Sequence, residues 1–238
     1  MKDEPRPLVA QKVTPGHPRR VVCRSMDRER QNAPSAVPPD GLATAHRVQV
    51  PAKETLFLEG DTAQSLFQVV SGVGKIYKMM PDGRAIITGF AYAEAMLGIA
   101  RAGHYFYNVD AVTDLALDSY SRAVVEARLH EDPHYLQHMF EETNDELAQA
   151  QERILLLGQK TPIEKVTSFL RRIRRWQHED RHIHVPMTRH DIADYLGLTT
   201  ETVSRTFTQL RDQNVIRSIN QHDIELLDVN QLKRLSEA

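Results

Sequence analysis

The stretch of sequence that is most informative about the fold is residues 187–210, MTRHDIADYLGLTTETVSRTFTQL. Their apolar residues recur at helical spacing, and the pattern is interrupted once, at Gly197. These apolar residues are Ile192, Ala193, Leu196, Leu198, Val203, Phe207 and Leu210. The stretch therefore predicts two short amphipathic helices joined by a glycine turn.

The second of these helices has two unlike faces. At 100° per residue its apolar side chains share one narrow arc, and a polar stripe lies opposite. The stripe consists of Glu201, Ser204, Arg205 and Thr208. It suits a helix in the major groove of DNA, where arginine can donate to guanine and glutamate can accept from a base amino group. The alternative is that Glu201 and Arg205 form an ordinary surface ion pair, worth about 0.2–0.5 kcal/mol.

The flanking segments match a winged helix-turn-helix domain over residues 159–238. Thr161-Pro162-Ile163-Glu164 has the pattern of a capping box and predicts the start of a helix that reaches Trp176. Short strands are predicted at 183–185, 215–219 and 223–227, and an amphipathic turn at 229–235. In this arrangement the residues expected to hold DNA phosphates are Thr188, Arg189, Thr200, Thr208 and Arg217.

Residues 133–158 are predicted to form a long helix that ends at Gly158. One stripe of residues recurs along it in alternating steps of four and three. The stripe consists of Leu136, Phe140, Thr143, Leu147, Ala150, Ile154 and Leu157. Because a heptad stripe keeps facing a partner helix, we interpret residues 131–158 as a parallel dimerisation helix. The alternative is that the stripe packs against the strands before it.

Residues 46–130 show the pattern of short antiparallel strands separated by turn signals such as Pro81-Asp82-Gly83-Arg84. The predicted strands are 55–58, 65–70, 75–79, 86–90, 107–112 and 115–121. Regularly spaced brief strands predict a small barrel or jelly roll. The expected fold class is therefore α+β: an N-terminal antiparallel β-roll, a long helix and a C-terminal winged helix-turn-helix domain.

Composition limits the class of protein. The 238 residues contain no apolar run of about 18–20 residues and no secretory signal, so a cytoplasmic location is expected. A single cysteine, Cys23, excludes an internal disulfide and a four-cysteine iron–sulfur site within one chain. Residues 1–45 hold more than half of the twelve prolines and lack apolar periodicity, which predicts a disordered basic arm.

The motif IADYLGLTTETVSRTFTQL, after strands and a long helix, resembles the Crp/Fnr family of bacterial transcription regulators over about residues 47–238. In the Fnr and FixK branch, E-x-x-S-R on the recognition helix reads TTGA in an inverted repeat. Glu201, Ser204 and Arg205 match that motif. The resemblance implies a homodimer on a TTGA-N6-TCAA-like palindrome. It also implies an activator that contacts RNA polymerase in microoxic, nitrogen-fixation or denitrification gene control.

The resemblance also raises the question of an effector. Cyclic-nucleotide-binding relatives have a glutamate where this chain has Ile99, and an arginine where it has Tyr105-Phe106-Tyr107. A buried phosphate without a cationic partner is strongly disfavoured, so a cyclic nucleotide is not expected. Some FixK relatives sense oxidation through a cysteine at the position of Thr188, which lacks that chemistry.

Several histidines are candidate ligands for haem or for a metal ion. His104 beside an aromatic run is a candidate haem ligand, which would make the chain a gas sensor or other small-molecule sensor. His134 and His138, near Glu141 or Glu142, could chelate a metal, although a solvated helix face is the simpler interpretation. No nucleophile elbow, phosphate-binding glycine loop or H-E-x-x-H motif indicates an enzyme. The expectation is a regulator without a cofactor or metal.

Overall fold

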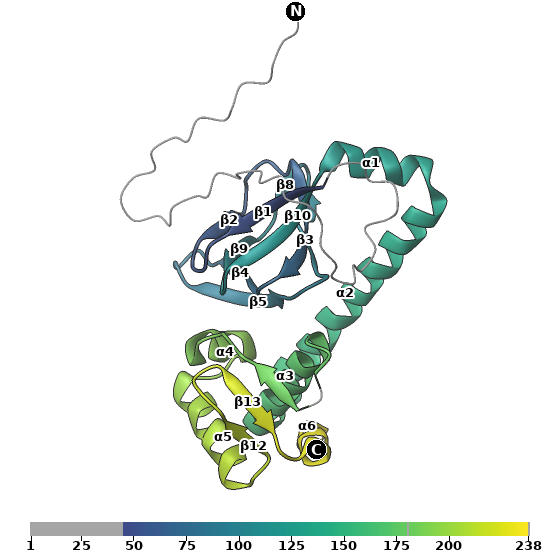
Figure 1. Cartoon of the computed structure of the whole chain (residues 1–238). Helices are drawn as coiled ribbons and strands as arrows, with labels where there is room; N and C mark the ends of the chain where they lie inside the picture. The colour runs from purple at the N-terminus through teal and green to yellow at the C-terminus, as the bar shows by residue number, and fades with distance from the viewer. Residues whose placement is uncertain (1–44, 180, 238) are drawn as a thin grey trace, which may run out of the picture.

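The computed structural model describes residues 45–179 and 181–237, without several side chains of the long helix, among them His138 and Glu142. Apart from its last residue, the basic arm expected at 1–45 lies outside these residues. The fold has three parts: a β-roll, a long helix that leaves it, and a C-terminal domain below the roll (Figure 1). Among the described residues, no helix is both long and apolar enough to cross a bilayer.

Ten strands form the roll as two four-stranded antiparallel sheets and a small hairpin. One sheet has the order β1-β10-β3-β6 and the other β2-β9-β4-β5, while β7 pairs with β8. The strands are β1 His46–Val50, β2 Thr55–Phe57, β3 Ser65–Ser71, β4 Gly74–Met79, β5 Ala85–Ala91, β6 Met96–Leu97, β7 Ala100–Arg101, β8 His104–Tyr105, β9 Asn108–Ala111 and β10 Leu115–Ser121. Alternating residues such as Leu115 and Leu117 are buried between the sheets, which confirms the expected β-roll.

Several short elements were not predicted. The strands β6, β7 and β8 have two residues each, too few to show a period of two. Helix α1 (Arg122–Glu131) buries only Val125, so it lacks the apolar stripe that identifies an amphipathic helix. Asp132 separates α1 from the next helix: its backbone is extended, and its carboxylate accepts hydrogen bonds from the N–H groups of His134 and Tyr135.

The long helix is α2, Pro133–Gln159. The prediction that it ends at Gly158 was wrong, because the helix continues through this glycine to Gln159 and Lys160 is its C-cap. Gly158 has no positive φ, so it does not act as the left-handed residue that commonly ends a helix. Helix α3 (Pro162–Trp176) follows at once, and the capping box between Thr161 and Glu164 is confirmed.

The C-terminal domain places two short helices against α3 and a three-stranded sheet. Its elements are β11 His182–His184, α4 Arg189–Leu196, α5 Thr200–Asp212, β12 Ile216–Ser218, β13 Asp223–Leu226 and α6 Val229–Ser236. The sheet has the order β11-β13-β12, so the last two strands form the wing. The amphipathic turn expected at 229–235 is a complete helix, α6, which packs on α3.

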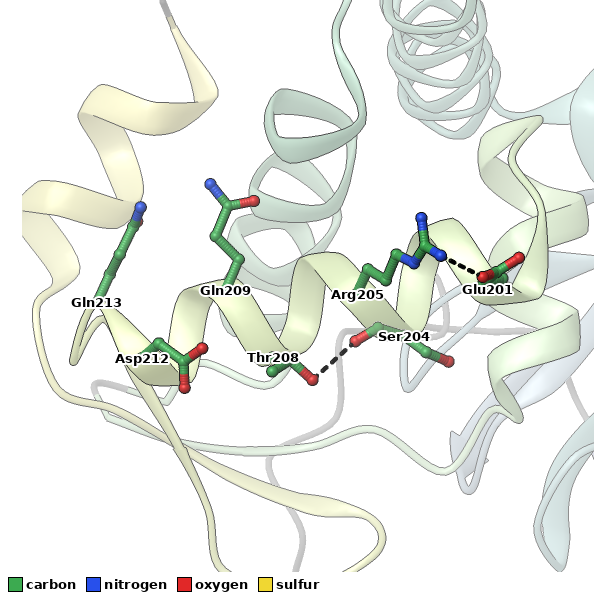
Figure 2. A pocket seen from close by; sticks show the side chains of 7 residues that line it. All are labelled: Glu201, Ser204, Arg205, Thr208, Gln209, Asp212 and Gln213. Carbon is green, nitrogen blue, oxygen red and sulfur yellow. Dashed lines mark hydrogen bonds and ion pairs between the residues drawn. The ribbon is translucent and has the colours of Figure 1, made fainter.

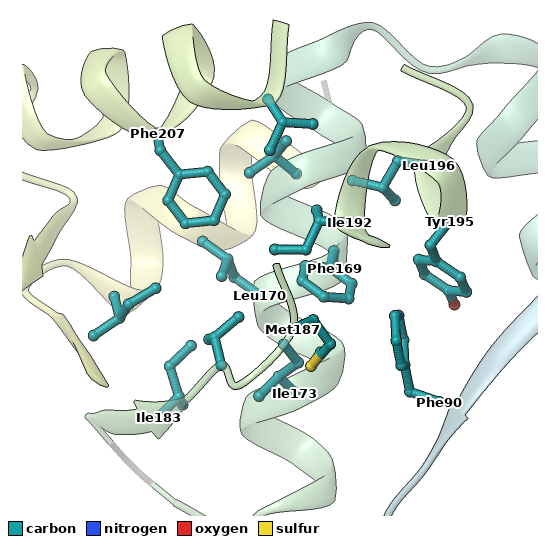
Figure 3. Packing of buried hydrophobic residues seen from close by; sticks show 14 of the residues in the cluster. Phe90, Phe169, Leu170, Ile173, Ile183, Met187, Ile192, Tyr195, Leu196 and Phe207 are labelled. Carbon is teal, nitrogen blue, oxygen red and sulfur yellow. The ribbon is translucent and has the colours of Figure 1, made fainter. Parts of the chain in front are cut away.

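One apolar cluster joins the C-terminal domain to the roll (Figure 3). The ring of Phe90 on β5 lies 5.2 Å from that of Tyr195 on α4 and 6.2 Å from that of Phe169 on α3. Beside them, the Tyr92 and Trp176 rings lie 4.7 Å apart. Because these side chains are shared, the position of α4 depends on the roll as well as on its own domain.

Gly197 makes the tight turn between α4 and α5. Its φ is +61°, in the left-handed region, and the N–H of Leu198 donates to the carbonyl of Ala193 at 2.9 Å. A side chain at such a position costs roughly 1–2 kcal/mol, because its Cβ approaches the backbone carbonyl. The sequence-based prediction of a glycine turn is therefore confirmed.

Replacing Gly197 with alanine is expected to lower the free energy of unfolding by about 1–2 kcal/mol. Urea unfolding would measure this as a lower midpoint with an unchanged slope. Gly158→Ala is the matched control: this helical glycine has open space at its Cβ position, so alanine should stabilise by roughly 0.5–1 kcal/mol. A Gly197→Ala protein as stable as the wild type would contradict the backbone argument.

Candidate nucleic-acid interface

The first helix of the motif begins with reciprocal capping. Thr188 accepts a hydrogen bond from the N–H of Asp191 at 3.0 Å, and the Asp191 carboxylate accepts from the N–H of Thr188 at 3.1 Å. Burial alone would raise the pKa of Asp191, but hydrogen bonds from Thr188 and the Lys75 ammonium group, 3.3 Å away, lower it below its ordinary value. Lys75 belongs to β4, so this ion pair also ties α4 to the roll.

Helix α5 buries one face and exposes the other. Val203, Phe207 and Leu210 are buried in the domain core. The four residues of the polar stripe are exposed and follow one edge of the helix (Figure 2). Thr199 caps the helix by accepting from the N–H of Thr202 at 3.1 Å, which fixes where α5 begins. In the first turn, Thr200 and Glu201 are exposed.

Within the stripe, Glu201 and Arg205 form an ion pair at 2.6 Å. Their side chains are 71% and 79% exposed, so this is a surface ion pair. Because such pairs are weak, each side chain can leave the other to contact a ligand. Ser204 donates to the backbone carbonyl of Thr200 at 2.8 Å. The surface ion pair considered as an alternative therefore exists, in a position open to a ligand.

The stripe is longer than the sequence pattern indicated. A shallow hollow along α5 is lined by Glu201, Ser204, Arg205, Thr208, Gln209, Asp212 and Gln213 (Figure 2). The last three residues were missed. Helical spacing would have found two of them, because Gln209 follows Arg205 by four positions and Asp212 follows Thr208 by four.

The residues expected at the DNA backbone lie in different environments. Thr188 and Thr200 are exposed at the starts of α4 and α5. Arg189 is only half exposed, because its guanidinium stacks on the Phe207 ring with its carbon 3.6 Å from the ring centroid. Burial and the nearby Arg211 lower the pKa of Arg189. Arg189 therefore helps to fix α4 against α5, whatever it contacts outside the protein.

Two further backbone candidates lie at the surface. Thr208 is exposed on α5, where it donates to the carbonyl of Ser204 and accepts from Arg211. Arg217 lies on β12 of the wing, where its side chain is exposed and pairs with Glu225 at 3.1 Å. The arrangement thus offers donors on α4, on α5 and on the wing.

Two family models match the chain. One, described as a Crp-like helix-turn-helix domain, matches residues 164–235, and the other, described as a cyclic nucleotide-binding domain, matches residues 47–132. The nitrogen fixation regulation protein FixK of Bradyrhizobium diazoefficiens is 37% identical over 196 residues, which cover 81% of this chain and 82% of that protein. The chain belongs to the Crp/Fnr family. It is a transcription regulator with a helix-turn-helix DNA-binding domain.

Other members of the Crp/Fnr family agree. The transcriptional activatory protein AadR of Rhodopseudomonas palustris is 37% identical over 176 residues, which cover 72% of this chain and 74% of that protein. The structure of FixK2 from Bradyrhizobium japonicum superposes with a TM-score of 0.78 at 31% identity, covering 82% of this chain and 98% of that one. FixK and AadR are both named as regulators.

The heptad stripe predicted from the sequence lies on the surface of α2. All seven stripe residues, from Leu136 to Leu157, are exposed in the single chain. Phe140 and Ile154 are the most exposed large apolar side chains, at 65% and 69%. The alternative that the stripe packs against the strands is therefore wrong, because these side chains are exposed and not buried against the roll.

The interior of the Crp/Fnr roll is filled by its own aromatic side chains. The Phe57 ring stacks on Tyr105 with centroids 3.9 Å apart and lies 5.5 Å from the Tyr107 ring. Both tyrosine hydroxyls are engaged: Tyr105 donates to the carbonyl of Ser65 at 2.8 Å, and Tyr107 accepts from the N–H of Gly98 at 2.9 Å. These rings, hydroxyls and backbone groups supply no cation.

Of the candidate ligand histidines, His104 and His134 have side chains that the structure describes. His104 is exposed on β8, and its Nδ1 lies 3.0 Å from the carbonyl oxygen of Ala102. His134 is exposed at the start of α2, while the side chains of His138 and Glu142 are outside those described. Among the described side chains, no group of three or more His, Cys, Asp or Glu residues is placed to hold a metal.

Proposed function

We propose that this Crp/Fnr regulator acts as a homodimer on a TTGA-N6-TCAA-like palindrome, where it activates transcription. The observation that carries this proposal is the polar edge of α5. There Glu201, Ser204 and Arg205 are exposed together, while Val203 and Phe207 behind them are buried. Arg205 would donate to guanine, Glu201 would accept from a base amino group, and Ser204 would contact a neighbouring base edge.

Contacts to the phosphates would fix this edge in the groove. Thr188 and Arg189 at the start of α4, Thr200 and Thr208 on α5, and Arg217 on the wing are the candidates. Phosphate contacts position the protein without reading sequence. A bound phosphate near Arg189 would also relieve the repulsion between Arg189 and Arg211 that contributes to the lowered pKa of Arg189.

The homodimer would form through α2. Its exposed stripe is apolar at a heptad repeat, and pairing with a second copy would remove that surface from water. Two-fold symmetry then places two α5 helices in successive major grooves about 34 Å apart, which requires an inverted repeat. The names of the relatives, a nitrogen fixation regulation protein and a transcriptional activatory protein, support a role in gene control. Such a regulator would act in the cytoplasm, and as an activator it would also need a surface for RNA polymerase.

We infer that the regulator works without a bound effector. Two observations support this inference. The Phe57, Tyr105 and Tyr107 rings are buried in the roll. In the sequence, Ile99 and Tyr105-Phe106-Tyr107 stand where cyclic-nucleotide-binding relatives have a carboxylate and a cation. The remaining alternative is a haem-responsive or other small-molecule gas sensor, for which His104 is the candidate ligand. Its exposed position, with Nδ1 close to a backbone carbonyl, argues against that alternative but leaves Nε2 open.

One experiment tests both proposals. Purified full-length protein, without added cofactor, is footprinted on a duplex with TTGA-N6-TCAA and on a duplex with scrambled half-sites. We expect protection of the palindrome alone, equal in air and under anaerobic conditions. Equal protection of the two duplexes would overturn the assignment of specificity. Protection that needs anaerobic conditions, together with a Soret absorption band, would favour the haem sensor.

A further inference from the structure

Arg153 lies where three parts of the molecule meet. It projects from α2, donates a hydrogen bond from Nη2 to the backbone carbonyl of Ile87 on β5, and lies with the same nitrogen 3.5 Å from the carbonyl oxygen of Tyr195 on α4. Its guanidinium also covers the Tyr195 ring, with 4.4 Å between the guanidinium carbon and the ring centroid. One side chain of the long helix therefore contacts both the roll and the helix-turn-helix motif.

Arg153 is an unusual residue to find in such a place. Its Nε is buried without a hydrogen-bond partner, and the contacts of its guanidinium with the described residues are two backbone carbonyls and a ring, with no carboxylate. Burial lowers the pKa of its guanidinium. A partly buried cation held by carbonyls and a ring face is costly to retain, so packing alone does not explain it.

The geometry of the contact fits an orienting role. The Tyr195 carbonyl belongs to the last turn of α4, where the helix dipole favours a positive charge. Arg172 on α3 donates to the Tyr195 hydroxyl at 2.7 Å, so the same tyrosine is held at both ends by arginines from different helices. The planar guanidinium can donate and stack at once, which a lysine ammonium group cannot do.

We propose that Arg153 is a positioning residue that fixes the orientation of the helix-turn-helix motif on the dimerisation helix, and thereby sets the half-site spacing that the dimer accepts. This inference rests on the proposed function. A rotation of the C-terminal domain about α2 would break the contacts of Arg153 with Tyr195. Such a rotation would move the two α5 helices relative to each other and leave each recognition edge intact.

This mechanism separates two measurements. Binding to one half-site depends on the edge of a single α5, whereas binding to a palindrome depends also on the distance between the two edges. Loss of Arg153 should therefore weaken palindrome binding and spare half-site binding. A purely structural role would weaken both equally, because it would reduce the folded fraction.

The test compares wild type with Arg153→Met, which keeps length and removes the charge and the planar donor. Each protein is titrated with a single TTGA half-site and with palindromes that have spacers of about four to eight base pairs. For Arg153→Met we expect palindrome affinity to fall at least about tenfold, and the spacer preference to flatten. Half-site affinity should stay within about twofold of the wild type, and sedimentation should still show a dimer.

Two further variants make the result decisive. Arg153→Lys keeps the charge, so its loss of palindrome affinity and of spacer preference should be smaller than for Arg153→Met. If the methionine variant does not fold, the lysine variant is measured in its place. Arg128→Met is the matched control: it removes an arginine of α1 that pairs with Asp132, at the other end of α2 from α4 (Figure 1), and should keep the spacer preference.

The inference is overturned if Arg153→Met keeps the wild-type spacer preference, or if half-site and palindrome affinities fall together. Failure of the proposed function is a separate outcome: the wild type itself would then bind the palindrome no better than scrambled DNA, at every spacing.

Discussion

Alanine at position 205 is expected to reduce the discrimination between the palindrome and random DNA by roughly 1–3 kcal/mol. The wild-type guanidinium is 79% exposed at the edge of α5 and can donate two hydrogen bonds to guanine. Alanine removes both donors and leaves the buried face of the helix unchanged, so stability should change little. Fluorescence anisotropy with the two duplexes, at one fixed salt concentration, measures the difference directly.

The loss of one positive charge weakens binding to all DNA, so the sequence-specific part has to be isolated. Replacing the guanine of each TTGA half-site should weaken the wild type and leave Arg205→Ala almost unaffected. Arg211→Ala removes an equal charge from a side chain that donates to Thr208, and it should keep the wild-type sensitivity to this base change. If Arg205→Ala responds to the guanine substitution as strongly as the wild type, Arg205 does not read that base.

The recognition edge could be found from sequence because it depends on local spacing. The helical positions of Val203 and Phe207 determine which side of α5 is buried, and the opposite side then carries Ser204 and Arg205. Gly197 was equally informative, since a left-handed turn restricts the residue type. Longer elements with a clear period, such as α2 and β10, were also identified, although the end of α2 was placed one residue early.

Contacts between distant segments left no such signal. The aromatic contact of Phe90 with Tyr195 and the ion pair of Lys75 with Asp191 join residues more than one hundred positions apart. Arg153 reads as a polar residue beside the heptad stripe, and only the fold shows its contacts with β5 and α4. The stacking of Arg189 on Phe207 was also missed, because an arginine at a helix start was interpreted only as a phosphate ligand.

Replacement of Ile154 with glutamate is expected to convert the dimer to monomers and to lower affinity for the palindrome by about 10²–10⁴-fold. Ile154 is 69% exposed in the single chain and lies on the heptad stripe of α2. In a parallel homodimer the two residues at this position face each other, so the variant would bury two like charges in an apolar seam. Binding to the second half-site then loses the advantage of being intramolecular.

The measurement combines sedimentation with DNA titration. The glutamate variant should sediment as a monomer with wild-type helical content, and its affinity for one half-site should match that of the wild type. Ala148→Glu adds the same charge at an exposed position of α2 away from the stripe, and it should remain a dimer. A dimeric Ile154→Glu protein would show that α2 does not form the interface. The surface that holds the two recognition helices together would then have to lie elsewhere on the molecule.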